Sequence, residues 1–305
     1  MKILHRLSKI CIVTLITIVS VSTNGCAKFI LMKPDGNDIT RPFAVEGFNK
    51  IRISNAFYAE LKKGIADSVI VTVPENVMPY VNVSVSEGEL TVKLRDNTNV
   101  KCDGCLRVIV VYAIVPKEIE ASGAAKIIVL DTLRNEKLKI ETSGASFIDV
   151  AFNVSNKASL DASGASKINA VATASQIEID ASGASKIEAT ATASQMDIDA
   201  SGASKITGTW QVSGKAEIEL SGAAQWTGKG FIHSVKADIS GASNFGSFDI
   251  LSDVMNGDFS GASKGTLTIA QSLSLSLSGA SKFKYRGNPA ISHLQTGGGS
   301  TVEKE

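Results

Sequence analysis

Apolar and polar residues alternate with a period of two through long stretches of the chain. In the middle of the sequence Ile177 and Ile179 alternate with Glu178 and Asp180. Successive side chains of a strand point to opposite faces, so this alternation places the isoleucines on one face and the acids on the other. This region keeps no helical period, and β-branched residues are frequent in it. The pattern therefore predicts an all-β fold.

The alternating stretches recur at a fixed interval. A Ser-Gly-Ala motif occurs nine times, and a degenerate Gly-Gly-Gly copy follows with Gly298 in register. The motif glycines are Gly123, Gly144, Gly164, Gly183, Gly202, Gly222, Gly241, Gly261 and Gly279. Their spacing is 18 to 21 residues. Repeats of this length bury their apolar sides by stacking on one another. We therefore predict a parallel β-helix (β-solenoid) of about 20 residues per turn, each turn rising by about 4.8 Å.

Aligning the units on the glycine gives two apolar columns. Four residues before it stand Ile119, Ile140, Leu160, Ile179, Ile198, Ile218, Ala237, Gly257, Leu275 and Leu294. Four residues after it stand Ile127, Ile148, Ile168, Ile187, Ile206, Trp226, Phe245, Gly265, Phe283 and Val302. We expect both columns to face inward and the glycine to lie at a corner, where it tolerates positive φ and lets turns stack closely. The charged tail, residues 301–305, is expected to cap the last turn.

The region before the repeats also shows strand patterns, at residues 51–57, 67–73, 81–85, 90–94 and 106–115. Residues 51–57 are a divergent copy of the corner. Turn residues such as Asn76, Pro79 and Gly88 separate the later strands. We therefore expect irregular, longer β-helix turns over residues 43–119 and regular Ser-Gly-Ala repeats over residues 120–305.

The N-terminus has the features of an export signal. Lys2, Arg6 and Lys9 precede an apolar run at residues 10–21, which is too short to span a bilayer comfortably. Small residues then lead into Cys26, as in a lipoprotein signal. We predict a signal peptide at residues 1–25, lipidation of Cys26, a tether at residues 26–42 and an outer-membrane location, since no Asp follows the cysteine. The alternatives are an ordinary signal peptide or a signal anchor with Cys26 incidental.

Two further cysteines, Cys102 and Cys105, form a Cys-x-x-Cys motif. After export they favour a local disulfide or a free pair, with Gly104 permitting the bend. A zinc site would need two more ligands, and His233 and His293 lie far along the chain. A thioredoxin-like redox pair would need a following helix, whereas residues 106–112 have a strand pattern.

Composition and charge narrow the possible partners. Hydrophobic residues make up 44% of the chain, which is enough for a packed fold. Without the three cations of residues 1–25, the 31 cations of the chain become 28 against 30 acids, a net charge of −2. This balance argues against nucleic acid as a partner. Nothing in the sequence calls for a cofactor or a catalytic serine, since no general base accompanies the repeated serines.

One acid per turn stands three residues before the corner glycine. These acids are Glu120, Glu141, Asp161, Asp180, Asp199, Glu219, Asp238 and Asp258. Stacked carboxylates repel, so something must offset them. The favoured explanation is a column of lysines three residues after the glycine: Lys126, Lys167, Lys186, Lys205, Lys264 and Lys282. The alternative is a divalent cation such as calcium, which carboxylate oxygens suit.

Three segments together resemble a known family. They are the pattern Phe48-x-x-Ile51-x-Ile53-Ser54, residues 87–92 (Glu-Gly-Glu-Leu-Thr-Val) and residues 119–124 (Ile-Glu-Ala-Ser-Gly-Ala). This combination is similar to the head GIN domain family, described as "putative auto-transporter adhesins" and common in Bacteroidetes. The resemblance covers most of residues 43–300. It implies a right-handed parallel β-helix, an envelope location and an adhesive role, and brings no catalytic residues. The near-perfect repeats and the Cys-x-x-Cys motif depart from the family pattern.

Three classes of function fit these features. We favour a non-enzymatic, lipid-anchored adhesin or binding module for a repetitive polymer, such as a glycan or an extracellular matrix polymer. A structural envelope protein without a specific ligand is the second possibility. A polysaccharide-active β-helix enzyme is the third, and it would need a concave groove that collects acids and an Arg from different columns.

Overall fold

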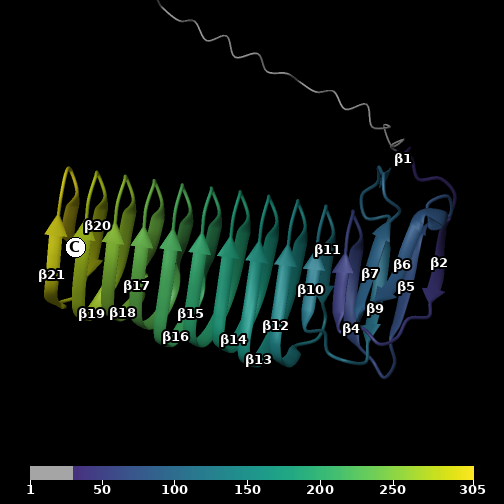
Figure 1. Ribbon diagram of the computed structural model, residues 1–305, viewed down its shortest axis with the longest axis horizontal. Coiled ribbons are helices and arrows are strands. Elements are labelled where there is room, and N and C mark those ends of the chain that lie inside the picture. The colour runs from purple at the N-terminus through teal and green to yellow at the C-terminus, as the bar shows by residue number, and fades with distance from the viewer. Residues whose placement is uncertain (1–29) are drawn as a thin grey trace, which may run out of the picture.

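The computed structural model describes residues 30–305, so the predicted signal peptide and Cys26 lie outside the described residues. The chain forms an elongated rod of stacked turns, shown in Figure 1. The elements are β1 (Ile30–Met32), β2 (Asp38–Phe43), β3 (Lys50–Ile53), β4 (Tyr58–Lys63), β5 (Ser68–Pro74), the 3-10 helix η1 (Met78–Tyr80), β6 (Val81–Ser86), β7 (Glu89–Leu94), β8 (Thr98–Val100), β9 (Arg107–Tyr112), β10 (Glu118–Ala121), β11 (Lys126–Val129), β12 (Leu133–Thr142), β13 (Phe147–Ala162), β14 (Lys167–Ala181), β15 (Lys186–Ala200), β16 (Lys205–Leu220), β17 (Gln225–Ile239), β18 (Asn244–Phe259), β19 (Lys264–Leu277), β20 (Lys282–Arg286), β21 (Ala290–Thr296) and β22 (Thr301–Lys304). Within residues 30–305, no helix has the length and apolar character needed to cross a bilayer.

The regular turns each consist of one long strand that bends once and one glycine corner. In β14 the inward alternation runs through Ala174 and resumes at Ile177, while Ser175 and Gln176 both face outward and mark the bend. Each strand therefore has two limbs, one after the corner and one before the next. Neighbouring turns pair in parallel and in register, as Ile168 does with Ile187. The predicted β-solenoid of roughly 20 residues per turn is confirmed, with about nine turns.

The two predicted apolar columns form the core. Ile140, Ile179 and Ile187 are fully buried, and the columns stay buried until the last turn, where Leu294 is 45% exposed. Toward the C-terminal end the core changes from isoleucine and alanine to aromatic rings. Trp210, Trp226, Phe245, Phe259 and Phe283 form a chain of neighbouring rings with centroids 5.1 to 5.8 Å apart.

Gly265 interrupts the second column because these rings fill its space. A Cβ at this position would lie 2.7 Å from Phe259 Cε1. The aromatic turns thus balance large and small residues, as close packing requires.

The corner glycines are required for two reasons. At Gly202 φ is +69°, and a Cβ would lie 2.7 Å from the carbonyl oxygen of Gly183 in the preceding turn. The divergent corner is confirmed as well, because Asn55 lies against Gly123 with φ of 64°. On its other side Asn55 has no stacked corner, and its Oδ1 accepts a hydrogen bond from Leu94 N at 2.8 Å. The Asn side chain thus satisfies the backbone where the corner stack stops.

The order of turns at the N-terminal end differs from the order along the chain. β3 lies between β7 and β10, and β4 lies between β9 and β11, all in parallel. Antiparallel strands then continue each layer, with β6 on β7, β5 on β9 and β2 on β5. These antiparallel strands differ from the irregular β-helix turns expected for residues 43–119. They lie at the N-terminal end of the rod (Figure 1).

Part of the segment expected to be a tether is also strand. β1 pairs with β8 in a separate two-stranded sheet, and β2 pairs with β5 at the edge of the large sheet. At the opposite end, the tail expected to act as a cap forms β22, which pairs with β20. Lys284 there forms ion pairs with Glu303 and Glu305.

Candidate functional site

The acids three residues before the corner glycines form a continuous row on the outside of the solenoid. Strand register aligns Glu120, Glu141, Asp161, Asp180, Asp199, Glu219, Asp238 and Asp258 from turn to turn. We call this row the acid ladder. Because the pairing is parallel and in register, its rungs repeat at the strand spacing of about 4.8 Å. The next position toward the N-terminal end is Arg52, which pairs in register with Glu120.

A groove of about 540 Å³ runs along the ladder beside the corners. We call it the acidic groove. Its lining consists of Arg52, the ladder from Glu120 to Asp199 and backbone or side-chain atoms of the corners, including Ser143, Ser163, Ser182 and Ser201. A smaller hollow of about 260 Å³ continues along Asp199 and Glu219, and another of about 250 Å³ reaches Asp238 and Asp258. Carboxylates thus line three hollows along the regular turns, and serines contribute to two of them.

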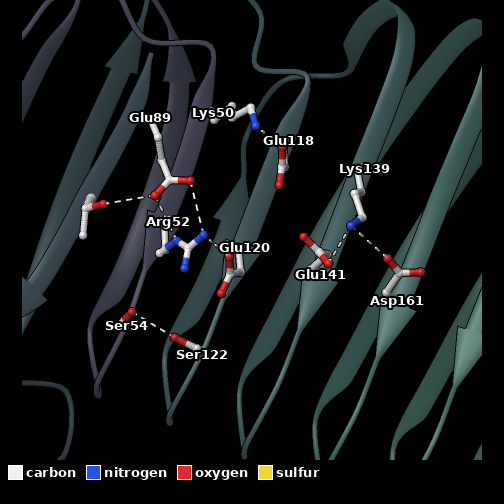
Figure 2. A network of polar contacts seen from close by, with 11 residues as sticks. Lys50, Arg52, Ser54, Glu89, Glu118, Glu120, Ser122, Lys139, Glu141 and Asp161 are labelled. Atoms are coloured by element: carbon white, nitrogen blue, oxygen red, sulfur yellow. Dashed lines mark hydrogen bonds and ion pairs between the residues drawn. The ribbon is translucent and has the colours of Figure 1, made fainter. Parts of the chain in front are cut away.

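The N-terminal end of the ladder is held by cations, as Figure 2 shows. Arg52 Nε lies 3.0 Å from Glu89 Oε1, and Arg52 Nη2 lies 3.0 Å from Glu120 Oε2. Partial burial raises the pKa of Glu120 above its ordinary value, although the charge of Arg52 opposes this. Beside them, Lys50 lies 2.9 Å from Glu118. Partial burial acts to raise the pKa of Glu118, but the hydrogen bond and charge of Lys50 prevail and lower it.

Lys139 provides the next cation along the ladder. Its Nζ lies 2.7 Å from Glu141 and 3.6 Å from Asp161 (Figure 2). The hydrogen bond with Glu141 raises the pKa of Lys139, so the lysine stays charged. At the corner, the Oγ atoms of Ser54 and Ser122 are 2.9 Å apart and form a hydrogen bond between neighbouring turns.

The middle of the ladder has no such cations. Among the described residues, Asp180, Asp199 and Glu219 form no ion pair within 4.0 Å. Partial desolvation, followed by the charge of Asp161 and a hydrogen bond with it, raises the pKa of Asp180 to about 6. Lys157, which stands four residues before Asp161 on the same limb, pairs instead with Glu178 of the neighbouring column at 2.7 Å.

The lysines that were expected to balance the ladder lie on the other limb, beyond the corner. Within the described chain they form no ion pair with a ladder carboxylate. Lys167 pairs with Glu188 at 3.1 Å, and Lys126 lies over the rings of Tyr58 and Phe147. The cations that do pair with the ladder, Arg52 and Lys139, were missed by the sequence analysis. Aligning Asn55 with the corner glycines would have found Arg52, which stands three residues before it.

The other candidate sites are simpler. Cys102 and Cys105 are bonded as a disulfide, with Cα atoms 5.9 Å apart. His233 lies 2.9 Å from Asp253 on the exposed bend, far from the cysteines in sequence. Residues 30–305 contain no group of three or more His, Cys, Asp or Glu side chains arranged to hold a metal ion.

The groove differs from an enzyme site of the kind considered above. The groove of about 540 Å³ gathers acids and an arginine of one column, whereas a polysaccharide-active site was expected to combine acids and an arginine of different columns. The adjoining hollow of about 260 Å³ does combine two columns of acids, but no arginine lines it. Arg52 is already engaged by two glutamates. Fold and groove together define the class: a parallel β-solenoid with a repetitive polar face.

A protein-family model matches most of this chain. It matches residues 47–230 and 192–289, and its description is "Putative auto-transporter adhesin, head GIN domain". The chain belongs to this family, as the three sequence segments indicated. No curated protein matches the chain.

Three solved structures are similar to this chain. A "putative adhesin" from Parabacteroides distasonis has 18% identity and a TM-score of 0.51, covering 90% of this chain and all of its own. A "putative adhesin" from Parabacteroides merdae has 19% identity and a TM-score of 0.44, covering 90% and 99%. A "putative lipid binding protein" from Parabacteroides distasonis has 15% identity and a TM-score of 0.48, with the same coverage. At 18% identity, the structure with the TM-score of 0.51 supports the fold of this chain and nothing about its function.

Proposed function

We propose that this protein is a non-catalytic, lipid-anchored envelope adhesin that binds a repetitive, hydroxyl-rich polymer along the acidic groove. The observation that carries the proposal is the ladder itself. One carboxylate and one corner serine recur in each turn, at an interval of about 4.8 Å. Membership of an adhesin family supports the adhesive role.

The chemistry of the groove suits a glycan or a matrix polymer. Ionised carboxylates accept hydrogen bonds from hydroxyl groups, and such charge-assisted bonds are stronger than neutral ones. Serine hydroxyls both donate and accept. Each rung contributes little, but a polymer with a matching repeat engages many rungs at once, and linked contacts multiply their effect through high effective concentration.

Regularity supports a non-catalytic role. Asp161, Asp180 and Asp199 occupy equivalent positions in successive turns, so any carboxyl pair in the middle of the ladder has a near copy one turn away. Catalysis requires one carboxyl to differ from its partner in protonation and role, which depends on distinct environments. A row of carboxylates that repeats at the same backbone position in successive turns suits binding.

The sequence of the N-terminus supports the lipid anchor of this proposal. Two or three acyl chains on Cys26 give stable membrane attachment where a single chain would not. We expect an outer-membrane location. Cys26→Ser should abolish palmitate labelling and leave either the precursor or a soluble protein, and unchanged labelling in this variant would contradict the anchor.

A screen of the mature protein on a glycan array and on extracellular matrix polymers tests the binding role. The groove variant combines Asp161→Asn, Asp180→Asn and Asp199→Asn, and the control combines Thr190→Ala with Thr192→Ala on the exposed face of the other limb. We expect the groove variant to lose binding by about tenfold or more and the control to retain it. Absence of binding to every polymer would favour a structural envelope protein, and release of shortened polymer would favour an enzyme.

A further inference from the structure

An exposed apolar edge stands where the described chain begins. In β1, Ile30 is 37% exposed and Leu31 is 63% exposed. β1 pairs only with β8, in a sheet separate from the large one, and Met32 packs against the core while the two preceding side chains do not. Two adjacent large apolar side chains are thus exposed to solvent. β1 itself lies at the N-terminal end of the rod (Figure 1).

The short distance along the chain from Cys26 indicates what covers this edge. Only four residue steps separate Cys26 from Ile30. A fully extended chain spans at most about 3.6 Å per residue, so the two lie within about 14 Å of each other. The inference rests on the proposed lipid anchor. If Cys26 carries acyl chains, the limit of about 14 Å keeps β1 next to the bilayer surface.

The charges around β1 favour apolar insertion over electrostatic attraction. β8 and its flanking loops carry the exposed cations Arg95 and Lys101 together with the exposed acids Asp96 and Asp103. The exposed Lys33 and Asp35 follow β1 and keep the balance. Lys101 N donates to Met32 O at 3.0 Å, which joins the loop that bears the disulfide to the end of β1. Because the charges balance, the edge lacks the polybasic character of a surface that binds anionic headgroups.

We propose that Ile30 and Leu31 insert into the interfacial layer of the membrane that anchors Cys26 and hold the N-terminal end of the solenoid against it. Amphipathic surface elements bury their apolar side chains about 5–10 Å into the boundary between headgroups and acyl chains. The edge of β1 adds such a contact to the acyl chains.

Tryptophan fluorescence tests the proposal. Trp210 and Trp226 are both fully buried, so their emission is shielded from a quencher in the membrane and gives a constant background. Leu31→Trp adds an exposed reporter at the edge. Ile291→Trp, at a residue that is 50% exposed at the far end, is the matched control. Both full-length variants are made in lipidated form and placed in phosphatidylethanolamine–phosphatidylglycerol vesicles that contain nitroxide-labelled phospholipid.

We expect the nitroxide to quench the reporter at position 31 about threefold more strongly than the one at position 291. Equal quenching, with palmitate present on the protein, would overturn this inference and leave the anchor intact. The inference would also be overturned if both tryptophans became buried through contact between copies of the protein while the nitroxide quenched neither of them. Absence of palmitate would overturn both the anchor and the inference.

Discussion

The regular turns from β13 to β19 and the N-terminal region from β2 to β11 use the same core chemistry but build it differently. In the regular turns each strand pairs with the next strand along the chain, so one repeat determines its neighbours. In the N-terminal region β3 lies between β7 and β10, and antiparallel strands continue the layers. The comparison teaches that alternation fixes which face of a strand is buried, whereas repetition is what fixes its partner.

The largest expected effect lies in the regular turns. Ile187 is fully buried between Ile168 and Ile206, so Ile187→Asp places an unpaired charge between two stacked turns. The free energy of unfolding should fall by more than about 4 kcal/mol. Lys186→Ala, one residue away on the exposed face, should change it by less than about 0.5 kcal/mol. Thermal or urea melts measure both, and equal losses would contradict the assigned facing.

A corner substitution distinguishes the two regions next. Gly202→Ala forces a Cβ toward the Gly183 carbonyl at positive φ, which should cost about 2–3 kcal/mol. At the N-terminal corner, Asn55→Gly removes only the hydrogen bond to Leu94 N and should cost about 1 kcal/mol. If both variants melt like the parent protein, close stacking of the corners does not stabilise the solenoid.

Much of the fold could be predicted from sequence because the repeat supplies many copies of one pattern. The inward columns at Ile168 and Ile187 and the divergent corner at Asn55 followed directly. The antiparallel pairing of β5 with β9 could not, since alternation is identical for either partner and either direction. The prediction that lysines balance the acid ladder was wrong for a related reason. The corner places Lys126 and its equivalents on the other limb, away from the ladder.

The cationic end of the ladder and its unpaired middle give a smaller contrast. Arg52→Ala leaves Glu89 and Glu120 without their cation, and because Arg52 is 42% exposed, solvent limits the cost to about 1 kcal/mol. Arg134→Ala is the control, since Arg134 is exposed and forms no ion pair within the described residues. Chemical denaturation should separate the two variants, and an Arg52→Ala protein as stable as the control would show that the network adds nothing.

The smallest effect concerns pH. The pKa of Asp180 is raised to about 6, so the folded state binds this proton more tightly than the unfolded state, where the carboxyl has its ordinary pKa. The resulting stability is fully present below the unfolded pKa and is lost as pH rises through about 6. The melting temperature should therefore fall slightly between about pH 4 and pH 6, and Asp180→Asn should reduce that fall. An unchanged slope in the variant would assign the pH dependence to other groups.

The most direct test of the central claim is polymer affinity as a function of the number of intact rungs. Asp161→Asn, Asp180→Asn and Asp199→Asn are introduced one, two and three at a time. Asp149→Asn and Glu188→Gln, alone and together, remove one and two charges from the other limb and match the single and double variants. For a polymer found on the array, each lost rung should raise Kd by about threefold, while the controls leave it unchanged. Loss of all binding with the first rung, or equal losses on both limbs, would contradict a repetitive binding surface along the acidic groove.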